Sequence, residues 1–340
     1  MTGTCFPQNS CRNFGFDPNV DEVMRMRYWG LSTFSVILAA AFVFGQAKTA
    51  PPDRSPTPPA SPERNEVTLP SAPVKLTDAQ IKVLIQRVAE NDVENNKKLH
   101  DYTYSERQEQ HKLDGKGAIS STETKTFDVL QIYGESVYRL IAKNDKPLSE
   151  KEAAKEDEKI QKIIDKRRNE SDSEREKRLK KEEKERGEGR EFVKEIADAY
   201  NFTQVGTEQI EGRDTYVIAA EPRPGFEPHR KEAKILTKIR GRIWIDAAES
   251  QWVKLDAEVI DTISFGLFLA RLHKGTHIVT EQTRVNDEVW LPRHTAVHVD
   301  VRLALLKNFN VNLDVTDKDY KKFHAESKIV GGVEEVKEQR

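Results

Sequence analysis

The chain has 340 residues and nearly balanced charge, with 55 Lys and Arg residues against 57 Asp and Glu residues. That balance argues against a nucleic-acid binder, which would carry a basic surplus. Hydrophobic residues make up only 36% of the sequence and charged residues 33%, so the core must be concentrated in some segments while others are solvated. The length suits one large domain or two small ones.

A secretory signal peptide is predicted at residues 25–47. Arg25 and Arg27 precede an apolar run that ends at Gly45-Gln46-Ala47; a basic start, an apolar core and small residues spaced by one are the three parts of such a signal. We expect cleavage after Ala47 and export to the periplasm. The alternative is an uncleaved anchor in the inner membrane, because the run lies near the lower limit of about 20 apolar residues for a spanning helix.

Residues 1–24 do not fit that signal and are interpreted as a non-native leader, with the biological start at Met24 or Met26. The only two cysteines, Cys5 and Cys11, lie in this leader. The exported chain would then have no disulfide, no cysteine for a lipid anchor and no thiolate metal site. Core burial alone would have to hold the domain together.

A proline-rich linker at residues 48–75 separates the signal from the folded part. A helix is expected next, over about residues 78–96. It begins with a capping box, Thr77-Asp78-Ala79-Gln80. Apolar residues then follow at helical spacing and predict a packed stripe: Ile81, Leu84, Ile85 and Val88.

An antiparallel meander is expected after this helix. Tyr102 and Tyr104 share one face of a first strand, and Asp114-Gly115-Lys116-Gly117 is a hairpin signal. Further turns are indicated at Gly134-Glu135 and Asn144-Asp145. Turns this short cannot cross over between parallel strands, so the strands must be antiparallel.

Residues 149–186 predict a charged helical insertion. Ser149-Glu150-Lys151-Glu152 is a second capping box, and charges of both signs alternate with few large apolar residues up to Arg186. We expect one solvated helical arm that Gly187 and Gly189 end, followed by a short amphipathic helix. The arm either carries no function of its own or docks an envelope protein partner.

Strands dominate from Phe202 to about Ala325, and residues 326–340 form a polar tail. Clear alternation over residues 290–306 indicates one face in a core and one face in water. Roughly ten strands with two or three helices on one side give an α+β fold. The predicted architecture is a large curved antiparallel sheet, a half-barrel, wrapped over helices.

No catalytic motif or cofactor fingerprint is present. The sequence has no GxSxG elbow, no HExxH, no phosphate loop and no dinucleotide fingerprint, so we predict no enzyme and no cofactor. His273 and His277 are four residues apart, as are His294 and His298. On a strand four residues span about 13 Å, too far to share an ion, and no metal site is predicted.

The candidate ligand-binding residues are apolar. Trp244, Trp252 and Trp290 are interpreted either as plain core or as the lining of a cavity between sheet and helices. A second group is either a buried strand or a flexible loop at the mouth of a cavity: Phe265, Leu267, Phe268 and Leu269. Gly266 permits a bend, which suits a gate over a groove.

Three stretches carry a resemblance to a known family: Gly241-Arg242-Ile243-Trp244-Ile245-Asp246, the return Trp252-Val253-Lys254-Leu255, and Val289-Trp290-Leu291-Pro292. With the helix and the meander, they make residues 76–325 resemble bacterial outer-membrane lipoprotein-sorting proteins, the LolA/LolB-like and RseB-like half-barrels. The resemblance implies a curved sheet that encloses an apolar groove for acyl chains. The missing lipidation cysteine looks like the soluble carrier branch, whereas the charged insertion departs from the basic carriers.

We therefore expect an exported, non-enzymatic protein that binds acyl chains of lipids or lipoproteins in an apolar groove. The alternative is an envelope-stress sensor or protein-interaction module of the same fold. A continuous groove on the order of several hundred Å³ would favour the carrier, and a filled core would favour the interaction module.

Overall fold

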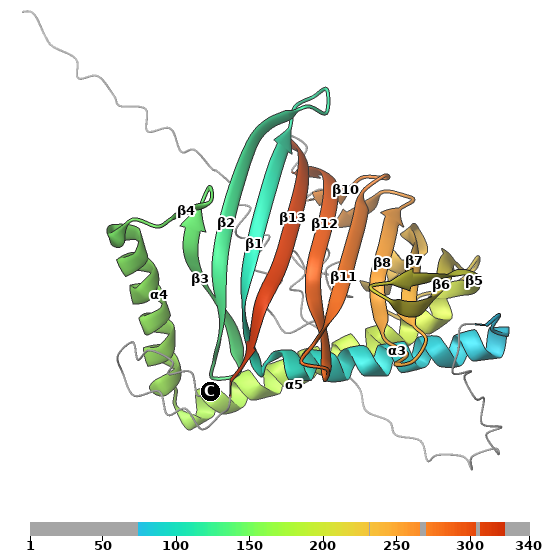
Figure 1. Ribbon diagram of the computed structural model, residues 1–340, viewed down its shortest axis with the longest axis horizontal. Helices are drawn as coiled ribbons and strands as arrows, with labels where there is room; N and C mark the ends of the chain where they lie inside the picture. The colour runs from blue at the N-terminus through green and yellow to red at the C-terminus, as the bar shows by residue number, and fades with distance from the viewer. Residues whose placement is uncertain (1–73, 231, 266–269, 304–306, 324–340) are drawn as a thin grey trace, which may run out of the picture.

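The computed structural model describes residues 74–230, 232–265, 270–303 and 307–323. The predicted leader, signal peptide and polar tail lie outside the described residues, as does nearly all of the predicted linker. Figure 1 shows one broad curved sheet standing over two long helices. None of the helices in the described ranges is long and apolar enough to span a bilayer.

The described part of the chain forms a 13-stranded sheet in which the paired strands are antiparallel. Its hydrogen-bonded order is β4-β3-β2-β1-β13-β12-β11-β8-β7-β6-β5, with β10 pairing to β12 and β9 to β10. This confirms the predicted α+β fold with a large antiparallel sheet. The first meander joins the last strand, because β1 pairs with β13.

The sheet has thirteen strands in the described residues, where roughly ten were predicted. In chain order they are β1 Tyr102–Leu113, β2 Ile119–Ile132, β3 Glu135–Lys143, β4 Lys146–Pro147, β5 Tyr200–Ile210, β6 Arg213–Pro222, β7 Ile239–Asp246, β8 Trp252–Val259, β9 Ile263–Phe265, β10 Ala270–Leu272, β11 His277–Val285, β12 Val289–Leu303 and β13 Lys307–Lys322. At the β3–β4 turn Asn144 and Asp145 have φ values of 49° and 56°. Asn and Asp accept this left-handed conformation more readily than most residues, which is why the pair marks a tight hairpin.

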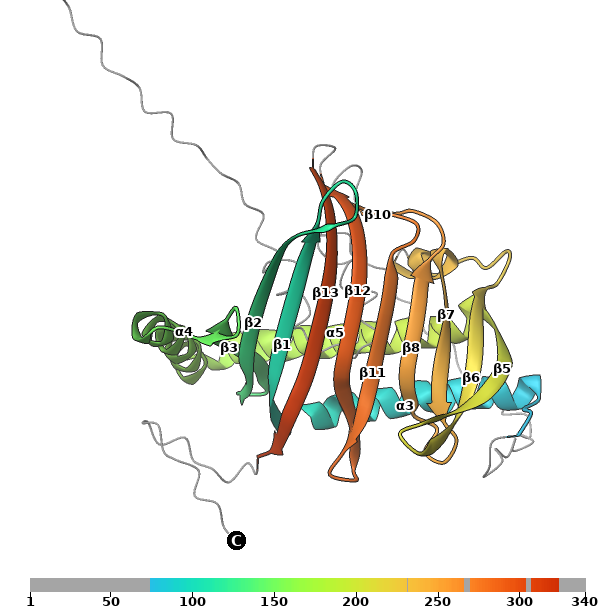
Figure 2. The same cartoon turned by 45° about the horizontal axis from the view of Figure 1, so that its top comes forward.

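The first described helix, α3 (Asp78–Leu99), begins as the capping box predicted. The Gln80 amide nitrogen donates to Thr77 Oγ1 over 3.3 Å, and the Thr77 amide donates to Gln80 Oε1 over 2.9 Å. The predicted stripe is buried: Ile81, Leu84, Ile85 and Val88. Figure 2 shows α3 beside α5 (Asp172–Ala199) beneath the sheet, and the two helices are in contact.

The charged insertion differs from the prediction because it contains two helices, α4 (Glu150–Arg168) and α5. Ser171 starts α5 through a capping box, in which its Oγ accepts a hydrogen bond from the Glu174 amide over 3.3 Å. Gly187 and Gly189 lie inside α5, so the predicted break there was wrong. A glycine costs a helix only about 1 kcal/mol; the helix continues into the apolar core, and the predicted short amphipathic helix is the end of α5.

The junction between α4 and α5 is held by a partly buried ionic network. Arg167 Nη2 donates to both carboxylate oxygens of Glu135 on β3, over 2.6 and 2.7 Å. Arg178 Nη2 donates to Glu170 Oε2 over 2.9 Å. α4 has no fully buried residue of its own, so these ion pairs contribute to holding the bend visible in Figure 1. We call α4 and this junction the charged elbow.

The apolar core lies mainly under β5–β8 and forms separate clusters. One cluster, which we call the α5 cluster, joins α5, the 3₁₀-helix η3 (Glu232–Lys238) and the strands β7 and β8. A second, the α3 cluster, joins α3 to β6, β7 and β8. On β1, in contrast, the buried positions beyond Tyr102 are polar: Glu106, Gln108 and Gln110. The apolar side of the sheet is therefore its β5–β8 half.

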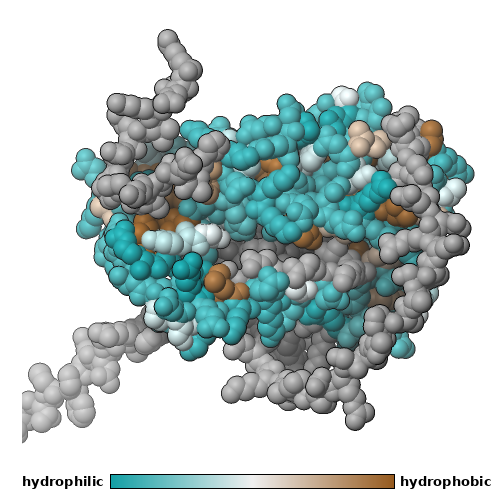
Figure 3. All heavy atoms as spheres, turned by 90° about the horizontal axis from the view of Figure 1, so that it is seen from below, coloured by the Kyte–Doolittle hydropathy of each residue, from teal (hydrophilic) through white to brown (hydrophobic). Residues whose placement is uncertain are grey.

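The outer surface agrees with the charged composition. The face seen in Figure 3 is mostly hydrophilic, with small separate hydrophobic spots. Large exposed apolar side chains in the described residues are scattered over different elements, among them Ile119 on β2, Leu179 on α5 and Val205 on β5. Isolated residues of this kind are ordinary on soluble proteins.

Candidate ligand pocket

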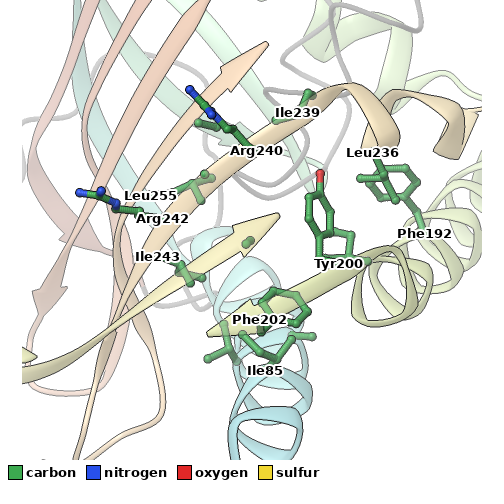
Figure 4. A pocket seen from close by; sticks show the side chains of 16 residues that line it. Ile85, Phe192, Tyr200, Phe202, Leu236, Ile239, Arg240, Arg242, Ile243 and Leu255 are labelled. Atoms are coloured by element: carbon green, nitrogen blue, oxygen red, sulfur yellow. The ribbon is translucent and has the colours of Figure 1, made fainter. Parts of the chain in front are cut away.

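An apolar pocket opens between the two main core clusters. Helix α3 contributes Ile85 and Val88, and helix α5 contributes Phe192 and Ile196. The sheet contributes residues from β5 to β8, and η3 contributes Leu236. Figure 4 shows these side chains converging from the two helices and the sheet. The pocket thus lies where neither helix fully covers the sheet.

The floor of the pocket is a row of small residues across three neighbouring strands. Ala220 on β6 lies directly opposite Gly241 on β7, and Gly241 lies opposite Ala257 on β8. All three line the pocket. Directly opposite residues of antiparallel strands share one face, so two methyl side chains and one glycine together leave one hollow. We call these residues the small-residue row.

Gly241 is required for a second reason. A Cβ built on this residue would lie 2.5 Å from the carbonyl oxygen of Asp256 on the adjacent strand. Backbone atoms cannot move aside as a flexible side chain can, so any larger residue would push β7 from β8. The close approach of the two strands and the depth of the hollow therefore depend on the same glycine.

The cavity volume is about 80 Å³, and the pocket is partly open to solvent. Sites for drug-sized ligands are typically ~300–1,000 Å³, several times larger than this pocket. The pocket bounded by the described residues therefore has room for a short stretch of one hydrocarbon chain. This is less than the several hundred Å³ that we set as the mark of a carrier.

Few polar side chains accompany the apolar walls. Arg240 and Arg242 on β7 alternate with the inward residues, and their side chains point away from the pocket in Figure 4. Arg240 Nη2 is 2.8 Å from Glu258 Oε2, and Arg242 is exposed. Tyr200, at the start of β5, is the remaining polar side chain among the lining residues. Burial raises its pKa above the usual range of a phenol.

The three predicted tryptophans do not line this pocket. Trp252 is only 1% exposed and packs in the α3 cluster, where its Nε1 donates to Asp92 Oδ1 over 2.8 Å. Trp244 lies on the opposite face of β7 from the small-residue row, and its Nε1 donates to Glu208 Oε2 over 2.8 Å. Alternation along β7 separates Trp244 from Gly241, so of the two interpretations of this tryptophan its position favours core over the lining of this pocket.

Trp290 belongs to an ionic cluster at the end of the sheet. Its Nε1 donates to Glu249 Oε2 over 2.7 Å, and the Arg213 guanidinium lies 5.3 Å from its ring centre. Arg284 Nε also approaches Glu249 Oε1, at 3.0 Å. The indole joins β12 to neighbouring turns and strands, so its position supports a structural contribution and not ligand contact.

The predicted gate lies almost wholly outside the described residues. Leu267, Phe268 and Leu269 lie outside the described residues, and Phe265 ends β9, opposite Ala270 on β10. The flanking strands are placed: Ile263 and Leu272 are buried in the α5 cluster, part of which lines the pocket. Contact between this segment and a ligand stays a prediction.

The histidines spaced four apart occupy strand positions and a neighbouring turn. His277 Nε2 is 2.5 Å from Asp256 Oδ1, and His294 Nε2 is 2.8 Å from Asp314 Oδ2. Within the described ranges no three His, Cys, Asp or Glu side chains form a group that could hold a metal ion. We assign these histidines to the polar face of the sheet.

Part of the pocket lining was named from the sequence without being assigned to a pocket: Ile85 and Val88 as a packing stripe, and Gly241, Ile243 and Leu255 within the stretches that carry the resemblance. Ala220 and Ala257 were not singled out. Each lies in a predicted strand as a small residue among larger apolar ones. That signal becomes specific only once the register shows that both lie beside Gly241.

Comparison with known proteins gives structural neighbours but no sequence relative. No protein-family model matches the chain, and no curated protein matches it. A DUF1329 family protein from Desulfovibrio piger aligns at 12% identity over 74% of this chain and 95% of its own, with a TM-score of 0.28. An outer membrane lipoprotein-sorting protein domain from Vibrio parahaemolyticus aligns at 13% identity over 72% and 95%, with a TM-score of 0.31.

A LolA superfamily protein from Nitrosomonas europaea aligns at 9% identity over 74% of this chain and 97% of its own, with a TM-score of 0.29. The Vibrio parahaemolyticus and Nitrosomonas europaea proteins carry names of the group that the sequence resembles. At such identities and TM-scores the alignments carry no argument about function. The functional argument therefore rests on the pocket itself.

Proposed function

We propose that this chain is an exported, non-enzymatic protein that holds part of an acyl chain from a lipid or lipoprotein in the apolar pocket. The observation that carries the proposal is the hollow over the small-residue row, which has apolar walls from two helices. Transfer of a methylene group from water to such surroundings contributes about 0.8 kcal/mol. A ligand that is apolar, narrow and flexible suits a hollow of this shape.

The size of the pocket sets how the ligand would bind. A stretch of about three methylenes would gain only about 2 kcal/mol from burial, less than the cost of immobilising a ligand. The acyl chain must therefore make further contacts with the protein outside the described pocket. We propose that these contacts involve Phe265, Leu267, Phe268 and Leu269, because Ile263 and Leu272 on the two flanking strands are buried in the α5 cluster, part of which lines the pocket.

Filling the hollow is expected to abolish acyl-chain binding without unfolding the protein. Ala220→Leu places an isobutyl group over the small-residue row, whereas Ala219→Leu places the same group on the opposite face of β6, across from Arg242. We expect Ala220→Leu to lose about 30-fold in affinity for a fluorescent acyl probe, which corresponds to the ~2 kcal/mol of burial. Ala219→Leu should bind like wild type.

Thermal melting of both variants provides the control. Each should unfold cooperatively within a few degrees of wild type, since the added group enters empty space or solvent. Equal probe affinity for Ala220→Leu and Ala219→Leu would contradict the placement of the ligand. A folded wild type that binds no acyl probe would defeat the carrier proposal and favour the interaction module.

Export is the second part of the proposal and rests on the signal pattern at residues 25–47. A periplasmic protein meets acyl chains of lipids and lipoproteins, so the location fits the ligand. N-terminal sequencing of the protein from an envelope fraction should begin at Lys48. A chain that still carries Cys5 and Cys11 would contradict cleavage, and a chain that begins at Met24 or Met26 would indicate the uncleaved anchor.

The charged elbow favours a second candidate function, docking of an envelope protein partner. α4 exposes charges of both signs and buries none of its residues, yet the Arg167–Glu135 contacts hold its end in place. A surface that is both exposed and fixed in orientation loses little conformational entropy when it binds. This candidate gains support if the acyl-probe titration fails.

A further inference from the structure

Tyr200 brings one polar atom to an otherwise apolar pocket. It follows Ala199, the last residue of α5, and begins β5, so its ring projects from the junction between helix and strand. The residue is 7% exposed and belongs to the α5 cluster. In Figure 4 its hydroxyl oxygen points toward the space between Ile239 and Leu236.

The Tyr200 hydroxyl has no hydrogen-bond partner among the described residues, whereas other buried or half-buried tyrosines have one. Tyr102 donates to a carboxylate oxygen of Glu288, and Tyr320 donates to the carbonyl oxygen of Pro292. A phenol hydroxyl inside a protein normally finds a partner. Because the pocket is partly open, that partner must be water or a bound molecule that supplies an acceptor.

The chemistry of the pocket restricts that acceptor to a neutral oxygen. An ionised carboxylate would exchange its water shell for a single neutral donor, which is strongly unfavourable. Neither arginine among the lining residues would neutralise a ligand carboxylate, because Arg240 is paired with Glu258 and Arg242 points away from the pocket. Because burial raises the pKa of Tyr200, the phenol stays protonated and can donate throughout the physiological pH range.

We infer that the Tyr200 hydroxyl donates a hydrogen bond to the carbonyl oxygen of a neutral acyl ester, so that the pocket takes the ester end of the chain. The inference rests on the proposed function and specifies its ligand. An ester carbonyl followed by a few methylenes matches one donor surrounded by apolar walls. An alkane would leave the donor unsatisfied, and an ionised fatty acid would bury its charge.

Three ligands of equal chain length test the inference on the full-length protein: a fatty acid methyl ester, the ionised fatty acid and an alkane. Each competes against the fluorescent acyl probe on wild type, on Tyr200→Phe and on Tyr104→Phe. On wild type the ester should bind about three- to tenfold more tightly than the alkane, the usual contribution of one neutral hydrogen bond. Tyr200→Phe should bind ester and alkane equally, with the alkane affinity unchanged.

Tyr104→Phe is the matched control, because Tyr104 lies on β1, away from the lining residues, and should keep the ester preference. Tyr200→Phe retains the ring and should melt at the wild-type temperature or above it, since only an unsatisfied hydroxyl is removed. An ester preference that survives in Tyr200→Phe would overturn the inference, as would a wild type that prefers the ionised acid. Failure of all three ligands to bind wild type would instead overturn the proposed function and favour the interaction module.

Discussion

One added methyl group at Gly241 is expected to destabilise the protein by about 3 kcal/mol, the upper end of the range for overpacked cores. The Cβ of Gly241→Ala would lie 2.5 Å from the Asp256 carbonyl oxygen. That oxygen belongs to the paired strand, so relief requires β7 and β8 to separate between the two core clusters. Chemical denaturation of wild type and Gly241→Ala measures the difference in the free energy of unfolding.

Gly206→Ala serves as the control for this prediction. Gly206 also lies in a strand, β5, but a Cβ there meets no atom within 4 Å. Replacing such a glycine reduces the entropy of the unfolded chain and should leave stability unchanged or raise it by up to about 1 kcal/mol. Equal effects of the two substitutions on the free energy of unfolding would show that a Cβ at position 241 fits between β7 and β8. The small-residue row would then lose its structural explanation.

Trp252→Ala is expected to cost about 3–5 kcal/mol, enough to abolish cooperative unfolding in a protein of ordinary stability. Trp252 is nearly fully buried against α3, and its indole N–H satisfies Asp92, which is itself 2% exposed. The substitution would leave both a cavity and a buried carboxylate oxygen without its donor. Thermal melting followed by near-ultraviolet circular dichroism checks the loss of tertiary packing.

A milder variant separates packing from ligand contact at the same position. Trp252→Phe keeps most of the apolar volume and loses the bond to Asp92, for which we expect a cost of about 1–3 kcal/mol. Because Trp252 does not line the pocket, the affinity of Trp252→Phe for the acyl probe should match that of wild type. Weaker probe binding by a well-folded Trp252→Phe would restore the tryptophan to the ligand site.

Local signals in the sequence were sufficient for most of the secondary structure. The Thr77 capping box placed the start of α3, and short turns such as Asn144-Asp145 made the meander antiparallel. These features depend on neighbouring residues alone, so an isolated sequence contains them. The helix break at Gly187 failed because burial of Phe192 and Ile196 further along α5 outweighs a small helix penalty.

The pocket was harder to anticipate because it depends on register between distant strands. Ala220 and Ala257 are separated by 37 positions in the sequence, yet each pairs with Gly241. The tryptophans were candidates for the cavity lining because they are large and apolar, but large side chains fill space and do not leave a hollow. A hollow forms where side chains are small, and small residues in strands give little signal until their partners are known.

The most direct test of the proposed acyl-chain site is a crystal structure of the full-length protein with a bromine-labelled acyl ester, in which anomalous scattering locates the label. Our account predicts a bromine peak in the pocket between the small-residue row and Tyr200, bounded by α3 and α5. Peaks found solely on the outer face of the sheet or along the charged elbow, with the pocket empty, would contradict it.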